Sequence, residues 1–230
     1  MAVHAAPVAH EEHHTSTGID NRKLFMWLFL ASDCFFFGSF IASYMLYRGR
    51  SLEGPFPHDT VVNGQTVKGI YDIPYTSVSS FVLLMSSLTM VLALAAIQRG
   101  NLRGCRIWLL TTALLGMTFL GGQVFEFTEF YNNGLSVSTN LFGSTFFVLT
   151  GFHGTHVAIG VLILLSLYFM VSRGRLGREQ ALNVELAGLY WHFVDVVWIV
   201  IFTLVYLIPS NENVGQAARE MPARLGGLFG

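Results

Sequence analysis

The chain alternates between long apolar runs and short polar connections, and five of the runs are long enough to cross a lipid bilayer. A helix needs about 20 mainly apolar residues to span the hydrocarbon core. The runs cover residues 24–47, 78–97, 107–127, 141–171 and 186–208. The pattern therefore predicts an all-α fold, a polytopic membrane bundle of five transmembrane helices. Its domain, 24–209, lies between a polar N-terminal tail, 1–23, and a polar C-terminal tail, 210–230.

The longest connection, 48–75, is rich in glycine and proline and reads as a surface loop. Within it, the segment VVNGQTV at 61–67 predicts a small hairpin, because Asn-Gly suits the tight turn between two antiparallel strands.

The distribution of basic residues predicts the orientation, since cytoplasmic loops carry the excess of lysine and arginine. With the N-terminus inside, the inner segments hold eight basic residues and the outer segments hold five. The inner set is Arg22, Lys23, Arg99, Arg103, Arg106, Arg173, Arg175 and Arg178. We therefore expect the N-terminus inside and the C-terminus outside.

Composition agrees with a membrane protein. The chain is 53% hydrophobic and 12% charged, whereas soluble domains are about 25% charged. A net charge of −1 and the lack of a basic run argue against nucleic acid as a partner. Cys34 lies well inside the first run and Cys105 at the edge of the third, so a disulfide between them is not expected.

The N-terminal tail carries four of the eight histidines, His4, His10, His13 and His14. A metal-binding tract and a solvated, mobile tail are both compatible with that composition, and the behaviour of chain termini favours the tail.

The chemistry of the chain centres on the segment YWHFVDVVW at Tyr190–Trp198, inside the fifth run. His192 and Asp195 are three residues apart and so share one helix face. A carboxylate at this depth costs a few kcal/mol, about 2.5–3.5 by membrane-insertion scales, unless a partner accommodates it. The segment GFHGTH in the fourth run supplies His153 and His156, and we expect the two segments to face each other.

Asp33 is the one charged residue of the first run. It is interpreted either as a functional or lipid-contacting carboxyl, or as a carboxyl kept neutral by burial beside a hydroxyl such as Ser32. Its depth overlaps with those of His156, His192 and Asp195. The sequence therefore predicts one polar cluster of Asp33, His153, His156, His192 and Asp195.

Glu126 lies near the outer end of the third run, three residues after Gln123, and is expected to be separate from this cluster. It has two interpretations, an interfacial carboxylate or a group with a specific role. Arg173 and Glu185, at the edges of the fourth and fifth runs, complete the candidates for buried polar or lipid contact. The hydroxyl residues of the second run, among them Ser79, Ser80, Ser86, Ser87 and Thr89, indicate close helix packing.

A redox or metal site has limited support in these residues. Only three histidines lie in the spans, and no four-ligand set with cysteines or carboxylates is evident. The alternative is neutral histidines that donate to backbone carbonyls and to Asp195. Motifs of hydrolases and phosphate-binding proteins are not found either.

Three segments carry a resemblance to a known family. They are FLASDCFFFGSFIASY at 29–44, GSTFFVLTGFHGTHVAIG at 143–160 and YWHFVDVVWIVIFTLVYLIP at 190–209, and QVFEF at 123–127 also fits. Together they resemble subunit III of the haem–copper terminal oxidases, over about 21–209. Long members have seven helices in two bundles around a lipid-filled, V-shaped cleft. This chain is similar to the short, five-helix bacterial form, whose cleft is incomplete or filled by another subunit.

The resemblance implies a non-catalytic subunit of a proton-pumping complex that reduces oxygen to water with electrons from cytochrome c. Haem and copper are then expected in partner subunits and none on this chain. The expected partners are subunit I as main contact, subunit II, a small subunit IV, cytochrome c at the level of the complex, and bound phospholipid. The implied roles are support of proton uptake, stability of subunit I and an oxygen route. The implied location is the bacterial inner, or plasma, membrane.

Asp33 matches the family's acidic position, which is glutamate in mitochondrial members, so its carboxyl reaches less far by one methylene. Alternatives remain open at this stage: a quinol oxidase subunit, a related nitric oxide reductase subunit, or, in a different class, a small independent transporter.

Overall fold

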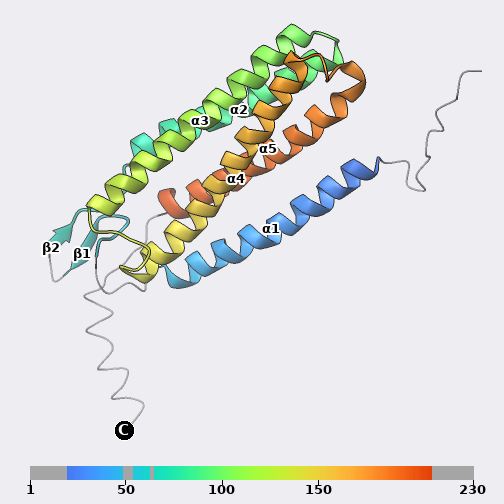
Figure 1. Ribbon diagram of the computed structural model, residues 1–230. Coiled ribbons are helices and arrows are strands. Elements are labelled where there is room, and N and C mark those ends of the chain that lie inside the picture. Colours follow the sequence, from blue (N-terminus) through green and yellow to red (C-terminus); the bar gives the residue numbers. More distant parts are fainter. Residues whose placement is uncertain (1–19, 49–53, 63–64, 209–230) are drawn as a thin grey trace, which may run out of the picture.

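The computed structural model describes residues 20–48, 54–62 and 65–208, and it contains the five predicted helices (Figure 1). They are α1 (Asn21–Tyr47), α2 (Ile73–Gln98), α3 (Leu102–Asn132), α4 (Leu141–Ser172) and α5 (Ala181–Ile201). All five are long and apolar enough to cross a membrane, so the prediction of a five-helix membrane bundle is confirmed. The four tail histidines and the C-terminal tail lie outside the described residues.

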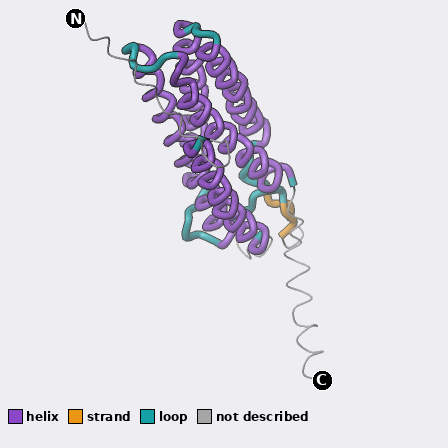
Figure 2. Tube along the Cα trace, turned by 90° about the vertical axis from the view of Figure 1, so that its right-hand side faces the viewer, coloured by secondary structure: helices purple, strands orange, loops and turns teal. Residues whose placement is uncertain are grey.

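The helices form a closed ring of neighbours. α1 packs on α4 and α5, α2 packs between α3 and α5, and α3 packs on α4. α4 also contacts α5, which closes the centre of the bundle. The turns α2–α3 and α4–α5 lie at the end where α1 begins, and the two short strands lie at the opposite end (Figure 2).

Four helices begin with the same device, an aspartate or asparagine whose side chain accepts a hydrogen bond from a backbone N–H of the first turn. Such caps satisfy donors that have no partner within the helix. The capping residues are Asp20, Asp72, Asn101 and Asn140, which accept from Arg22, Tyr75, Gly104 and Gly143. The caps extend α2 and α3 beyond the apolar runs, so that α2 begins at Ile73, with Pro74 in its first turn.

Three helices end in a glycine that turns the chain. After α3, the backbone at Gly134 has a φ of 86°, a conformation that residues with a β-carbon rarely adopt. The N–H of Leu135 then donates to the carbonyl of Phe130, and the N–H of Gly134 to that of Tyr131, which completes a Schellman motif. Gly100 and Gly174 end α2 and α4 in the same way. These motifs make short turns between successive helices possible.

The predicted hairpin is present. β1 (Thr60–Val62) pairs antiparallel with β2 (Gln65–Val67), with Val62 opposite Gln65. The Asn63-Gly64 turn itself lies outside the described residues.

The fifth span does not end as a simple α-helix. A short 3-10 turn, η1 (Arg178–Gln180), precedes α5, and a π-helix, η2 (Phe202–Leu207), follows it. At that end, Arg48 donates to the backbone carbonyls of Leu204 and Ile208, while a ring nitrogen of His58 lies 2.9 Å from the carbonyl oxygen of Tyr206. The side chains of Arg48, just after α1, and of His58, in the loop before β1, thus satisfy carbonyls that the last turn leaves without helical partners.

Large apolar side chains lie outside as well as inside the bundle. On α1, Phe35 is 81% exposed and Phe25 is 71% exposed, whereas Phe37 is buried. A soluble protein rarely shows so continuous an apolar surface. A bilayer or partner subunits therefore have to cover this exterior.

Candidate functional site

The first polar group lies in the seam between α2 and α5. The hydroxyl of Ser87 donates a hydrogen bond to Oδ2 of Asp195, and its oxygen lies 3.0 Å from Nδ1 of His192. Asp195 is 3% exposed, and its second carboxyl oxygen is enclosed without a hydrogen-bond partner. The polar partner expected for Asp195 is therefore Ser87 of α2, and this serine also links Asp195 to His192.

The second polar group joins α1 to α4. Nε2 of His156 lies 3.8 Å from Oδ2 of Asp33, and both side chains are largely buried. Nδ1 of His156 lies 2.8 Å from the carbonyl oxygen of Phe152, and because a carbonyl only accepts, Nδ1 carries a proton. Nε2 is thus the atom that faces the carboxyl. The structure gives Asp33 this imidazole as its neighbour in place of Ser32.

The hydroxyl of Tyr190 donates to the backbone carbonyl of His156 at 3.0 Å and ties α5 to the same place. The Asp33–His156 pair is therefore held from three helices, because α1, α4 and α5 each contribute a side chain.

His153 stands apart from both groups. It is fully buried, its ring stacks on Trp198 with centroids 4.8 Å apart, and Phe119 meets it edge-on. Neither ring nitrogen has a hydrogen-bond partner. Hydrogen bonds and ring contacts do not join Asp33, His153, His156, His192 and Asp195 into one network, and a single cluster of the five stays a prediction. Shared depth does not guarantee a shared helix face, and these residues divide among a pair, a serine-linked group and an aromatic stack.

Glu126 is separate from these groups, as the sequence indicated, but it is a buried carboxyl and not one exposed at the interface. It is 6% exposed, and Thr76 at the start of α2 donates to its Oε1 at 2.8 Å. Gln123, one turn earlier, donates to the backbone carbonyl of Thr150 on α4 at 2.9 Å. The acid and the amide thus fix α3 to two neighbouring helices.

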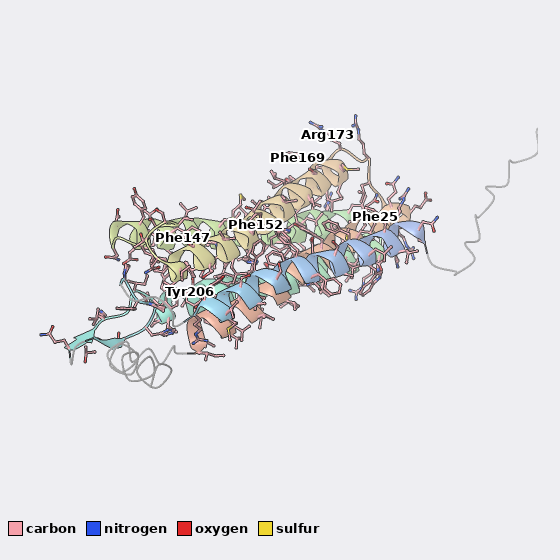
Figure 3. The ribbon with its side chains drawn as sticks, turned by 90° about the horizontal axis from the view of Figure 1, so that it is seen from below. Phe25, Phe147, Phe152, Phe169, Arg173 and Tyr206 are labelled. Carbon is pink, nitrogen blue, oxygen red and sulfur yellow. The ribbon has the colours of Figure 1, made fainter. Side chains whose placement is uncertain are left out.

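The two remaining candidates lie at the end of the bundle where α1 begins. The carboxylate of Glu185 forms an ion pair with the ammonium group of Lys23, with 2.7 Å between nitrogen and oxygen. This ion pair joins the N-terminal parts of α1 and α5. Arg173 is exposed at the end of α4, beyond Phe169 and far along the helix from Phe152 (Figure 3). Neither side chain reaches the mid-membrane groups, so a lipid contact at the membrane edge is the interpretation that remains for Arg173.

In the described part of the chain, no three histidine, cysteine, aspartate or glutamate side chains are grouped as metal ligands. Cys34 and Cys105 are both free, with Cys34 exposed and Cys105 buried.

Two hollows adjoin these groups. An apolar cleft of 430 Å³ lies between α1, α4 and α5 and is lined by Phe25, Phe29, His156, Ile163 and Tyr190 among others. It opens beside the Asp33–His156 pair.

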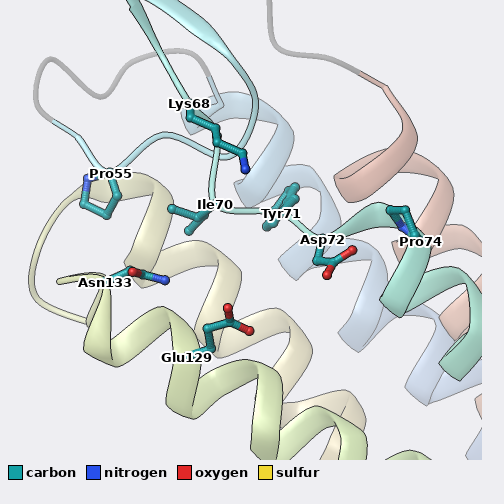
Figure 4. Close-up of a pocket in the computed structure, with 9 residues that line it drawn as sticks. Pro55, Lys68, Ile70, Tyr71, Asp72, Pro74, Glu129 and Asn133 are labelled. Atoms are coloured by element: carbon teal, nitrogen blue, oxygen red, sulfur yellow. The ribbon is translucent and has the colours of Figure 1, made fainter.

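The second hollow, of 620 Å³, lies at the end of the bundle that carries the two strands, and it brings together Lys68, Asp72, Glu129 and Asn133 (Figure 4). Tyr71 lines it too, and burial raises the pKa of its hydroxyl well above the ordinary value. The hollow at this end is thus polar, whereas the cleft beside Asp33 is apolar.

Sequence reasoning did not single out Ser87 as the partner of Asp195, nor the two indoles of α5 as polar partners of α2. Nε1 of Trp191 donates to Ser86 at 2.9 Å, and Nε1 of Trp198 donates to Ser80 at 2.8 Å. The spacing of these residues in the sequence could have indicated the pairing. The two tryptophans are two helical turns apart and the two serines nearly two turns apart, so each tryptophan can meet one serine when the two helices run antiparallel.

Comparison with known proteins decides between the interpretations left open by the residues. A model of the family described as cytochrome c oxidase subunit III matches residues 5–210. The chain belongs to this family. The family assignment favours an oxidase subunit over an independent transporter, and it makes the protein a multi-pass membrane component of an oxidoreductase complex with partner oxidase subunits.

Relatives with both kinds of electron donor in their names are similar to the chain. It is 36% identical to "Cytochrome c oxidase subunit 3" of Thermostichus vulcanus over 205 residues, which cover 89% of this chain and 94% of the relative. It is 34% identical to "Quinol oxidase subunit 3" of Bacillus subtilis (strain 168) over 207 residues, which cover 90% of this chain and 96% of the relative. It is also 34% identical to "Cytochrome bo(3) ubiquinol oxidase subunit 3" of Pseudomonas aeruginosa over 204 residues, covering 89% and 93%.

Proposed function

We propose that this chain is the non-catalytic subunit III of a terminal oxidase in the bacterial plasma membrane that reduces oxygen to water with electrons from cytochrome c and pumps protons. The observation that carries the proposal is the family match over nearly the whole chain, together with relatives named as cytochrome c oxidase subunits. The N-terminus faces the cytoplasm. Haem and copper reside in partner subunits, with subunit I as the main contact and subunits II and IV as further partners.

The role within the complex is to support proton uptake and the stability of subunit I. Asp33 is the residue with which we associate this role, because a carboxyl at mid-membrane depth faces His156 beside an apolar cleft. A phospholipid acyl chain fits the chemistry of this cleft, since its lining is almost wholly apolar. The carboxyl and the lipid would order the surface against which subunit I stands.

The test is oxygen consumption by the purified complex over successive turnovers, with and without this chain, at two pH values. The initial rate should be nearly unchanged, and activity should then decay during turnover, faster at high pH, when the chain is missing. Asp33→Ala should reproduce part of that decay. Ser39→Ala, on the same helix, is the matched control, because Ser39 is exposed and its hydroxyl bonds only to its own helix. Equal time courses with and without the chain would contradict the supporting role.

The cofactor proposal has its own measurement. Metal analysis and absorption spectra of the isolated, folded chain should give no stoichiometric haem, copper or zinc, and the spectrum of the intact complex should give haem. A stoichiometric metal on the isolated chain would refute this part.

A quinol oxidase is the second candidate, because relatives with that name are about as similar as those named for cytochrome c. The donor is distinguished by assaying the same complex with reduced cytochrome c and with a quinol. A complex that consumes nitric oxide instead of oxygen would support the nitric oxide reductase alternative.

A further inference from the structure

His192 presents one ring nitrogen to the outside of the bundle. Its Nδ1 faces Ser87, but Nε2 has no hydrogen-bond partner in the described part of the chain and is not enclosed by protein atoms. The side chain is half-buried, at the seam of α2 and α5. A polar atom therefore opens onto the surface of a helix bundle whose exterior is otherwise apolar here.

The depth of His192 restricts what can meet this atom. At 1.5 Å per residue it lies about 9 Å along the helix from the start of the predicted span, 186–208, and about 24 Å from its end. The hydrocarbon core of a bilayer is about 30 Å thick, so lipid head groups and interfacial water do not normally reach such a position. A polar group that faces hydrocarbon is costly, and such groups usually face protein.

The surroundings of Nε2 have the shape and chemistry of a helix-packing surface. Leu84 and Val91 lie on either side of Ser87 on α2, and Val196 and Ile199 lie one and two turns after His192 on α5, all with exposed side chains. Their exposed fractions are 38%, 50%, 57% and 43%. This α2–α5 surface, defined by these four residues and His192, is an apolar strip with a single hydrogen-bonding atom in it.

The hydrogen bonds of Ser87 determine the polarity of that atom. A hydroxyl has one proton, and Ser87 uses it to donate to Asp195. Ser87 must then accept from Nδ1–H of His192, so Nε2 of the neutral imidazole carries the lone pair and accepts. The missing partner is therefore a donor.

We propose that the α2–α5 surface is the docking site for a transmembrane helix of the haem-bearing oxidase subunit, which donates a side-chain hydrogen bond to Nε2 of His192. Suitable donors in a membrane helix are serine, threonine, asparagine, glutamine, tyrosine or tryptophan, which form hydrogen bonds between helices while apolar side chains pack around them. The inference rests on the proposed function and adds to it the face of the chain and the atom that recognise the partner.

The first test is site-specific photocrosslinking in the native membrane, with a tagged full-length chain. A photoreactive amino acid at Val196 or Leu84 should give an adduct with the haem-bearing subunit. Leu114 on α3 and Leu162 on α4 are the controls, because they are 51% and 64% exposed and belong to helices other than α2 and α5. They should give no such adduct.

The outcomes separate the two proposals. A tagged wild-type chain that brings down no haem would refute the oxidase proposal and this one with it. A chain that copurifies with haem but forms adducts only from Leu114 or Leu162 would overturn the docking surface alone. Adducts of Val196 with lipid only, or with a second copy of the chain, would overturn it equally.

The second test addresses the hydrogen bond. His192→Ala should weaken the complex, raising its dissociation constant about three- to tenfold, as expected for one hydrogen bond between membrane helices. His192→Gln keeps an acceptor oxygen and should recover most of the affinity. The thermal transitions of both isolated variants are measured alongside, so that a loss of folding is distinguished from a loss of affinity. Equal weakening by Ala and Gln, or none by Ala, would mean that Nε2 receives no hydrogen bond.

Discussion

The indole ring of Trp191, on α5, lies directly against the backbone of Gly116, on α3. A β-carbon added at Gly116 would be 2.6 Å from the ring, which is closer than real β-carbons approach another atom. Gly160 on α4 meets the same ring, with a distance of 2.8 Å. Three helices therefore meet around one buried tryptophan, and two of them do so through glycine.

Gly116→Ala should destabilise the subunit by about 1–3 kcal/mol, because the extra methyl group overpacks a tightly filled core. Gly121→Ala is the matched control on the same helix, since nothing lies within 4 Å of a β-carbon there. Unfolding of the purified variants in detergent, followed by circular dichroism, measures both. Equal stability of the two variants would mean that the helices separate easily at Trp191.

Ser87→Ala should cost about 1–3 kcal/mol, because Asp195 loses the donor that satisfies one of its buried oxygens. The loss should exceed that of His192→Leu, since His192 reaches the carboxyl only through Ser87. Ser166→Ala on α4 should change little, because that hydroxyl is exposed and bonds to its own helix. The free energy of unfolding, measured for the three variants, gives the order of these losses. A larger loss for His192→Leu would show that the imidazole, and not the hydroxyl, is the main partner of Asp195.

His153→Phe should leave stability unchanged or raise it by about 1 kcal/mol, because neither ring nitrogen has a partner and phenylalanine keeps the stack on Trp198. His153→Ala should instead cost about 3 kcal/mol through the cavity that it leaves. Thermal unfolding of both variants gives the comparison. A loss of several kcal/mol with phenylalanine would indicate a water molecule or another group bonded to the ring.

Glu126→Leu should destabilise by about 1 kcal/mol, because the hydroxyl of Thr76 loses its shorter hydrogen bond and keeps only the one to the backbone carbonyl of Asp72, whereas Glu126→Gln keeps an acceptor oxygen and should cost less. Glu129→Gln, at an exposed position on the same helix, is the control and should be neutral. The measurement is again the unfolding transition. If Glu126→Gln lowered the free energy of unfolding as much as Glu126→Leu, the negative charge of Glu126 would itself be required. A second hydrogen-bond donor to the carboxylate would then be implied.

The sequence by itself determined the class of the protein, the number of helices and the hairpin. Length and hydropathy suffice for the helices because, in a bilayer, backbone groups must be satisfied within the segment. The same local logic placed the Asn-Gly turn between β1 and β2. It also identified which residues were exceptional, since an ionisable group such as Asp33 or Asp195 is conspicuous in an apolar run.

Only the tertiary structure decided which residues meet. Asp33 and Asp195 lie at similar depths, yet Asp33 faces His156 on α4 and Asp195 faces Ser87 on α2. The rotation of each helix about its own axis separates them. Hydropathy along these helices scarcely records that rotation, because both the lipid-facing and the protein-facing sides are apolar. Packing around Trp191 fixes the rotation of the helices, through contacts between residues far apart in the chain. The partners of the buried acids could therefore be identified only from the folded bundle.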